Sequence, residues 1–137
     1  TIKKALEEYT PSNSRSQLLE KDGNKIILDA YNANPSSMKL AIENFAKMEG
    51  EKVLILGSMM ELGEASDAEH EMIVNLVKEH TWKAVTFTGQ GYKNLPSAFL
   101  YFNNAAETAD WYKKQSFKNV TVLIKGSRSM QMEKVVE

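Results

Sequence analysis

The sequence predicts a doubly wound α/β domain with a mostly parallel sheet and an antiparallel hairpin at the edge of that sheet. Short, continuous apolar runs alternate with amphipathic helical stretches, a pattern typical of a parallel sheet that helices cover on both faces. An Asp-Gly pair joins two apolar runs near the start, which favours a hairpin. The 137 residues suit a single domain, and no repeat or low-complexity segment divides them.

The first part of the chain predicts an entry helix followed by the hairpin. Residues 2–9 place their apolar side chains on one helical face, and Pro11 ends this pattern. Residues 17–20 and 25–29 follow as the two hairpin strands. We expect residues 1–14 to act as a linker or entry helix and residues 15–137 to form the body of the domain.

From there helices and strands alternate. Asn34 suits an N-cap and Pro35 the first helical position, so a helix is expected from there through residue 48. A second helix is expected to begin with a Ser66 and Glu69 capping box and to carry His80 on its apolar stripe. A third opens at Asn104, and a terminal helix follows from about Ser129. The predicted buried strands cover residues 53–56, 84–88, 99–102 and 120–124.

Composition excludes several classes of function. The net charge of -1 argues against a sequence-independent nucleic-acid binder or a membrane-surface binder, which normally carry a basic excess. No apolar run approaches the roughly 20 residues that span a bilayer. The absence of cysteine excludes disulfides and thiol chemistry and fits a cytoplasmic protein. The first residue is Thr1 rather than methionine, consistent with a piece of a longer polypeptide.

Open α/β folds bind ligands at the sheet edge that the carboxyl ends of the strands form. Three of the predicted strands are followed there by unusual loops, and the first of these loops is rich in polar residues. Residues 29–35 leave a strand and enter a helix, whose N-terminus favours an anion. Asp29 can accept hydrogen bonds from ribose hydroxyls, and Asn32 offers both a donor and an acceptor. The alternative interpretation is a well-capped helix with the aromatic Tyr31 in its entry loop.

Two further strands end in unusual loops. Residues 57–63 form a turn bracketed by two glycines, with Glu61 between them, but they lack the spacing and the lysine of a phosphate loop. The alternative is a connection whose methionines pack into the core. Lys125, Ser127 and Arg128 form a turn suited to phosphate or carboxylate, the alternative being a solvated basic turn.

The two histidines carry weaker signals. His70 lies at the start of its helix near the predicted ligand face and is the one candidate for a catalytic role, although a lone histidine is more often packed. His80 is expected to be packed or capping. No His, Asp and Glu group has metal-ligand spacing. Gly89 and Gly91 lack the third glycine of a dinucleotide fingerprint, which disfavours a small oxidoreductase.

Taken in order, these motifs resemble the C-terminal domain of the Mur ligase family. The strings that carry the resemblance are Tyr-Asn-Ala-Asn-Pro at 31–35, Leu-Gly-x-Met-x-Glu-Leu-Gly at 56–63, His70, and Lys-Gly-Ser-Arg at 125–128. The pattern is most similar to that of the member that adds D-alanyl-D-alanine, and it spans the chain from about residue 9 onward.

The resemblance implies a Rossmann-like third domain of an ATP-dependent ligase. Its parent chain would also hold an N-terminal domain that binds UDP-muramoyl-tripeptide and a central domain that carries the phosphate loop and the Mg²⁺ ligands. ATP would activate the tripeptide carboxylate as an acyl phosphate, which the amine of D-alanyl-D-alanine attacks. By itself this chain is expected to be inactive.

The resemblance also assigns residues. Arg15, Asp29, Tyr31 and Asn32 match positions near the nucleotide, and Asn34, Lys125, Ser127 and Arg128 match positions that face the acceptor dipeptide. One departure is Ser58, where family members often carry aspartate, so a direct role for this position is in doubt. The alternative from another class of function is a stand-alone nucleotide- or peptide-binding module without catalysis.

Overall fold

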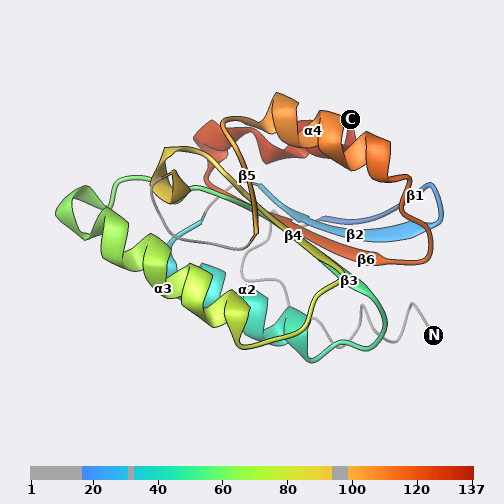
Figure 1. Cartoon of the computed structure of the whole chain (residues 1–137), viewed down its shortest axis with the longest axis horizontal. Helices are drawn as coiled ribbons and strands as arrows, with labels where there is room; N and C mark the ends of the chain where they lie inside the picture. The colour runs from blue at the N-terminus through green and yellow to red at the C-terminus, as the bar shows by residue number, and fades with distance from the viewer. Residues whose placement is uncertain (1–16, 31–32, 94–98) are drawn as a thin grey trace.

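A computed structural model describes residues 17–30, 33–93 and 99–137 (Figure 1). Six strands form one sheet in the order β1-β2-β6-β3-β4-β5, in which every neighbouring pair is parallel except β1 and β2. The strands are β1 Gln17–Lys21, β2 Asn24–Asp29, β3 Lys52–Gly57, β4 Ala84–Thr88, β5 Leu100–Phe102 and β6 Thr121–Lys125. The α-helices of the described residues are α2 Pro35–Ala46, α3 Ser66–Lys78 and α4 Ala105–Gln115. The predicted α/β class is confirmed; the helix expected over residues 2–9 lies outside the described residues.

The antiparallel hairpin at the edge of the sheet is confirmed. β1 pairs with β2 in a register that sets Gln17 opposite Leu28 and Lys21 opposite Asn24. Asp22 and Gly23 both have positive φ, 55° and 82°. This is the backbone of a tight turn whose twist matches the strands, and it is why an Asp-Gly pair is a reliable signal.

Two helices begin where the sequence predicts. Asn34 caps α2, since its side-chain oxygen accepts a hydrogen bond of 2.8 Å from the N–H of Ser37, and Pro35 fills the first position. Asn104 caps α4 in the same way through the N–H of Glu107, at 2.9 Å.

Three expectations about helix ends are wrong. A 3-10 helix, Gly63–Ala65, precedes α3, so Ser66 is already helical and does not cap. His80 was expected to be packed or capping on the apolar stripe of α3, but the helix ends at Lys78, two residues earlier than that stripe suggests. His80 is therefore exposed, beside Trp82. The terminal segment forms two 3-10 helices, Arg128–Met130 and Met132–Val136, which are separated by Gln131 at φ 52°.

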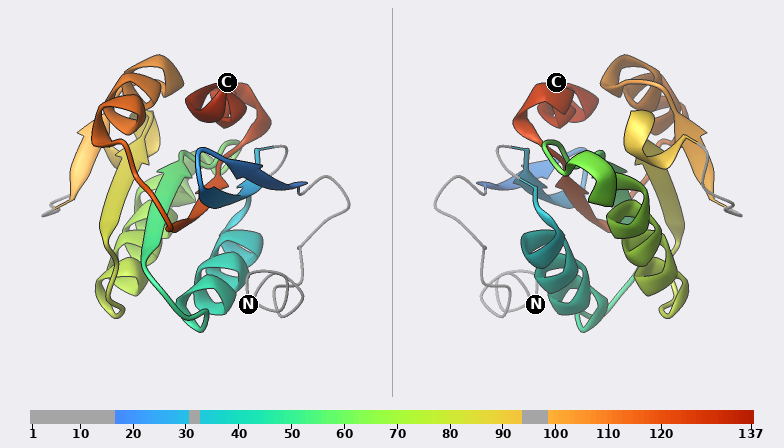
Figure 2. Two further views of the ribbon diagram at one scale, coloured as in Figure 1. Left: turned by 90° about the vertical axis from the view of Figure 1, so that its right-hand side faces the viewer. Right: turned by 90° about the vertical axis from the view of Figure 1, so that its left-hand side faces the viewer.

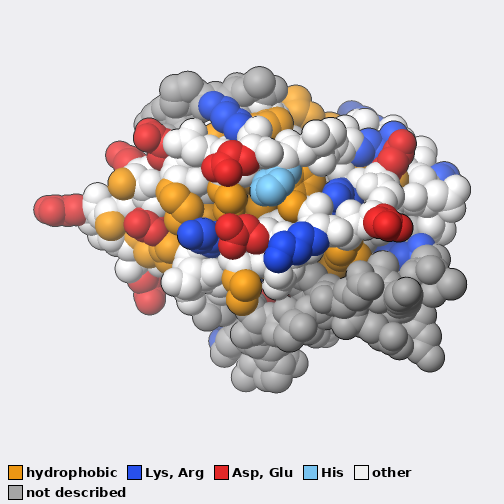
Figure 3. Space-filling model, turned by 90° about the horizontal axis from the view of Figure 1, so that it is seen from below, with side chains coloured by type: hydrophobic (Ala, Val, Ile, Leu, Met, Phe, Trp, Pro, Cys, Tyr) orange, Lys and Arg blue, Asp and Glu red, His pale blue; other side chains and the backbone are white. Residues whose placement is uncertain are grey.

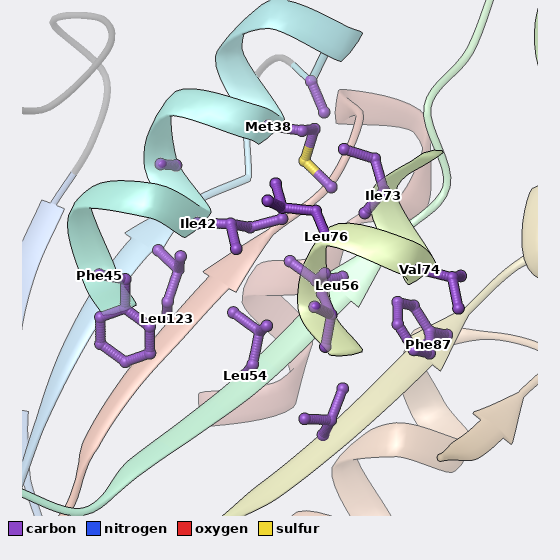
Figure 4. Packing of buried hydrophobic residues seen from close by; sticks show 14 of the residues in the cluster. Met38, Ile42, Phe45, Leu54, Leu56, Ile73, Val74, Leu76, Phe87 and Leu123 are labelled. Atoms are coloured by element: carbon purple, nitrogen blue, oxygen red, sulfur yellow. The ribbon is translucent and has the colours of Figure 1, made fainter. Parts of the chain in front are cut away.

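Helices cover both faces of the sheet. Figure 2 shows α2 and α3 on one face and α4 with the C-terminal segment on the other. Each face has its own apolar core. In the first core, side chains from both helices meet the sheet, where burial stabilises each by about 1.5–3 kcal/mol (Figure 4). This core includes Met38, Ile42, Phe45, Leu54, Leu56, Ile73, Val74, Phe87 and Leu123.

The outer face of the helical layer is polar and mixed in charge. Figure 3, which looks onto the side that carries α2 and α3, shows acidic and basic side chains interspersed among small apolar areas. Within the described residues no helix is long and apolar enough to cross a bilayer.

The chain turns in opposite directions at neighbouring strand ends. After β2 and β3 it enters helices on one face, whereas after β6, which lies between them, it passes to the other face. Such a switch point opens a crevice at the carboxyl edge of a sheet. Gly57 and Gly126 let the strand ends approach: a Cβ on Gly126 would lie 3.0 Å from the Gly57 Cα and 2.8 Å from the Met132 Cγ.

Candidate functional site

A cavity of about 470 Å³ lies at this switch point. It is lined by Ala33, Met60, Glu61, Ser127, Arg128, Ser129 and Gln131. These residues come from the segments that follow β2, β3 and β6. The structure therefore brings together the three strand-end loops in which the sequence predicts a site.

A second cavity lies beside the first and shares Arg128 with it. It measures about 530 Å³ and runs between the hairpin strands and the C-terminal segment, lined by residues such as Leu19, Leu28 and Glu133. Apart from Arg128, it contains none of the described residues that the sequence predicts for a site. The smaller cavity is therefore the candidate functional site.

Ser58 holds the loops behind the cavity together. Its side chain is buried, and its hydroxyl donates to the Thr88 carbonyl at 3.2 Å and accepts from the N–H of Gly91 at 3.0 Å. Its own carbonyl accepts from the N–H of Ser127 at 3.2 Å. Ser58 thus links the ends of β3, β4 and β6, a structural role for the position where the family often carries aspartate.

His70 anchors the loop after β3 from the inside. The N–H of Met59 donates to Nε2 at 2.9 Å, so that nitrogen carries no proton, and Nδ1–H donates to the Ser66 carbonyl at 2.7 Å. Tyr92 packs edge-on against the ring. Burial lowers the pKa of His70, an effect partly opposed by the hydrogen bond to Ser66 and by the charges of nearby acidic side chains. The side chain is fully buried and does not line the cavity, so the geometry gives this candidate catalytic residue a structural task.

Asp29 and Lys125 bind each other inside the sheet. They lie side by side on β2 and β6, and Lys125 Nζ donates to Asp29 Oδ2 at 2.6 Å with both side chains fully buried. Neither residue lines the cavity. Because both side chains are fully buried, contact of Asp29 with a ribose, or of Lys125 with an acceptor, would require the side chain concerned to become accessible.

The remaining predicted residues divide into two groups. Ser127 and Arg128 line the cavity directly, and the exposed Asn34 caps α2 next to the lining residue Ala33. Arg15, Tyr31 and Asn32 lie outside the described residues.

Five lining residues were not assigned from the sequence: Ala33, Met60, Glu61, Ser129 and Gln131. Glu61 and Gln131 both adopt positive φ, 62° and 52°, a conformation that is unfavourable for residues other than glycine. The position of Glu61 between two glycines was the one available signal, since nothing in the sequence marks Gln131. In the described part of the chain, no group of three or more His, Cys, Asp or Glu side chains is placed to hold a metal ion.

Comparison with known proteins gives a consistent result. The chain is 38% identical over 83% of its length to a UDP-N-acetylmuramoyl-tripeptide–D-alanyl-D-alanine ligase from Buchnera aphidicola. It is 31% identical over 98% of its length to the corresponding ligase from Bacillus subtilis. It spans 26% and 32% of those two proteins, about a quarter to a third of the length of these curated relatives.

Solved structures agree with this result. A MurF ligase from Thermotoga maritima in complex with ADP superposes with a TM-score of 0.78 at 26% identity, over 94% of this chain and 30% of that one. MurF from Acinetobacter baumannii gives 0.78 at 28% identity, over 97% and 31%. The family described as "Mur ligase, glutamate ligase domain" matches residues 14–128. The chain therefore belongs to this Mur ligase domain family.

Proposed function

We propose that this chain is the C-terminal domain of the ATP-dependent ligase that adds D-alanyl-D-alanine to UDP-N-acetylmuramoyl-tripeptide in peptidoglycan biosynthesis. The observation that carries the proposal is the meeting of three strand-end loops around one cavity, in a chain similar over most of its length to ligases of that name. A stand-alone binding module is less well supported, because the similar proteins are three to four times longer ligases.

In the proposed reaction, ATP transfers its terminal phosphoryl group to the tripeptide carboxylate, giving an acyl phosphate and ADP. The amine of the dipeptide then attacks the acyl carbon, phosphate leaves and the nitrogen loses a proton. ATP, Mg²⁺ and the tripeptide would be held mainly by the N-terminal and central domains of the parent chain.

This domain would close over the nucleotide and present the dipeptide. Arg128 can bind a carboxylate through two parallel hydrogen bonds, and Ser127 and Ser129, whose hydroxyls lie 3.2 Å apart, line the same cavity. Holding the amine at the acyl carbon converts a bimolecular step into an oriented one, and closure keeps water from the acyl phosphate.

The nucleotide side of the site remains a prediction. It rests on Arg15, Tyr31 and Asn32, which lie outside the described residues, and on Asp29, which is paired with Lys125. A cytoplasmic location is part of the proposal and is consistent with the absence of cysteine.

The test is an assay of the full-length parent chain with ATP, Mg²⁺, UDP-muramoyl-tripeptide and D-alanyl-D-alanine, read by mass spectrometry. We expect the UDP-muramoyl-pentapeptide to form together with stoichiometric ADP, and we expect no product when D-glutamate replaces the dipeptide. Formation of the D-glutamate product instead, or no amide with either acceptor, would contradict the proposal.

A further inference from the structure

We propose that Glu61 binds the ammonium group of the incoming dipeptide in the cavity that it shares with Arg128, which takes the carboxylate. The inference rests on the proposed function and adds a specific residue to it. Glu61 belongs to the loop after β3, whereas Arg128 follows β6, so the two charges reach the cavity from different elements.

The placement of Glu61 leaves its carboxylate open to a ligand. The side chain is exposed and lines the cavity. The ion pairs found within the described residues, Lys83 with Glu51 and Lys125 with Asp29, do not involve it. A cation that enters the cavity therefore meets a carboxylate that forms no ion pair with a described basic side chain.

The backbone at Glu61 is held in an unfavourable conformation. Its φ is 62°, and another of the positive-φ residues other than glycine, Gln131 at 52°, lines the same cavity. Gln131 caps the end of the 3-10 helix Arg128–Met130, as Ser116 caps α4, and Asp22 lies in the hairpin turn, which are all places where a positive φ is expected, whereas Glu61 lies in a loop. Strain of this kind persists only where the surrounding structure fixes it, and it gathers at ligand sites.

The residues just before Glu61 supply that fixation. Ser58 is tied to Thr88, Gly91 and Ser127, and the Met59 N–H is held by the buried ring of His70. Glu61 therefore follows residues whose positions are fixed by hydrogen bonds, so that less backbone entropy is lost there when a ligand binds.

The cavity matches the chemistry of a zwitterionic dipeptide. D-alanyl-D-alanine carries an ammonium group at one end, a carboxylate at the other and two methyl groups between them. The lining offers one carboxylate, Glu61, one guanidinium, Arg128, and two apolar side chains, Ala33 and Met60. Charged hydrogen bonds at both ends would fix the direction of the dipeptide, so that its nitrogen and not its carboxylate faces the acyl phosphate. The Glu61 carboxylate can accept the proton that the ammonium group loses before its neutral amine attacks.

The first test replaces Glu61 by glutamine in the full-length ligase. Glu61→Gln keeps the size of the side chain and removes its charge. We expect the KM for D-alanyl-D-alanine to rise about 10-fold or more while the KM for ATP stays within about 2-fold. Glu64→Gln is the matched control, because Glu64 is exposed in the adjoining 3-10 helix and does not line the cavity. This control should leave both constants unchanged.

A second readout separates charge recognition from a merely structural effect. N-acetyl-D-alanyl-D-alanine, which lacks the ammonium group, serves as an inhibitor competing with the dipeptide. The wild-type enzyme should bind it more weakly than the dipeptide, and Glu61→Gln should shrink that difference at least several-fold. If the wild-type enzyme forms the amide, but the variant keeps the wild-type KM for the dipeptide and the same preference for the dipeptide over its N-acetyl form, only the role of Glu61 is refuted and the proposed function stands. If wild type forms no amide with D-alanyl-D-alanine, the proposed function itself is refuted.

Discussion

At the scale of single residues, Asp29 and Lys125 lie at the strand ends where the sequence predicts them, but in the structure they bind each other. Both stand at strand ends, where a ligand-binding residue is expected, yet each satisfies the charge of the other inside the sheet. The sequence places them 96 positions apart, and only the pairing of β2 with β6 sets them opposite each other.

This ion pair leads to a stability prediction. Lys125→Met should lower the free energy of unfolding by about 3–5 kcal/mol, because it removes the ammonium group that balances the charge of the buried Asp29 carboxylate. Lys83→Met, which breaks the exposed pair with Glu51, should cost less than about 1 kcal/mol. Urea unfolding measures both. Equal losses for the two variants would show that the buried pair is solvated in solution.

His70 leads to a pH prediction. Its folded pKa lies below the ordinary value near 6.5, since burial and the Met59 N–H favour the neutral ring. The unfolded chain therefore binds more protons as the pH falls through about 6.5, and the stability contributed by His70 is present above that pH and lost below it. We expect thermal unfolding midpoints to fall between pH 7.5 and about 5.5.

His80 provides the matched control for that measurement. It is exposed, whereas His70 is fully buried. His70→Gln should flatten the pH dependence between 7.5 and about 5.5, while His80→Gln should leave it as in wild type. A slope that persists in His70→Gln and disappears in His80→Gln would contradict the assignment.

At the scale of elements, α2 and α4 offer a comparison, because an asparagine caps each of them. Asn34→Ala and Asn104→Ala should each lower stability by about 0.5–2 kcal/mol. Asn34, which precedes Pro35 and follows the lining residue Ala33, is the one that the sequence assigns to the acceptor site, so in the full-length ligase we expect only its variant to raise the KM for the dipeptide as well. Equal KM effects from both variants would remove Asn34 from the acceptor site.

Local chemistry explains which elements the sequence predicts well. Caps, the Asp-Gly turn and the apolar runs act within a few residues, and these features agree with the structure. The helix ends that differ have two other causes. Ser66 turns toward His70, one turn along the same helix, rather than capping, and the terminal segment bends at Gln131 as Met132 and Val135 pack against the sheet. The packing of the terminal segment depends on strands far along the chain, and it leaves no local signal.

At the scale of the whole molecule, strand order creates the site. The sequence predicts that the loops after β2, β3 and β6 carry polar groups, but it gives no means of knowing that β6 lies between β2 and β3. That order brings the three loops around one cavity and turns the chain in opposite directions beside it. The contributions of Met60, Glu61 and Gln131 follow from this arrangement, and they could not be assigned from the loops taken one at a time.

The central claim is that this cavity receives the acceptor dipeptide. The most direct measurement is the KM for D-alanyl-D-alanine of the full-length ligase carrying Arg128→Ala, with Lys39→Ala as control because Lys39 is exposed on α2 and does not line the cavity. Loss of a charged hydrogen bond worth about 1.5–3 kcal/mol predicts a rise of about 10- to 150-fold, with the KM for ATP within about 2-fold of wild type and the control unchanged. An unchanged dipeptide KM together with a raised ATP KM would contradict the account and assign the cavity to the nucleotide.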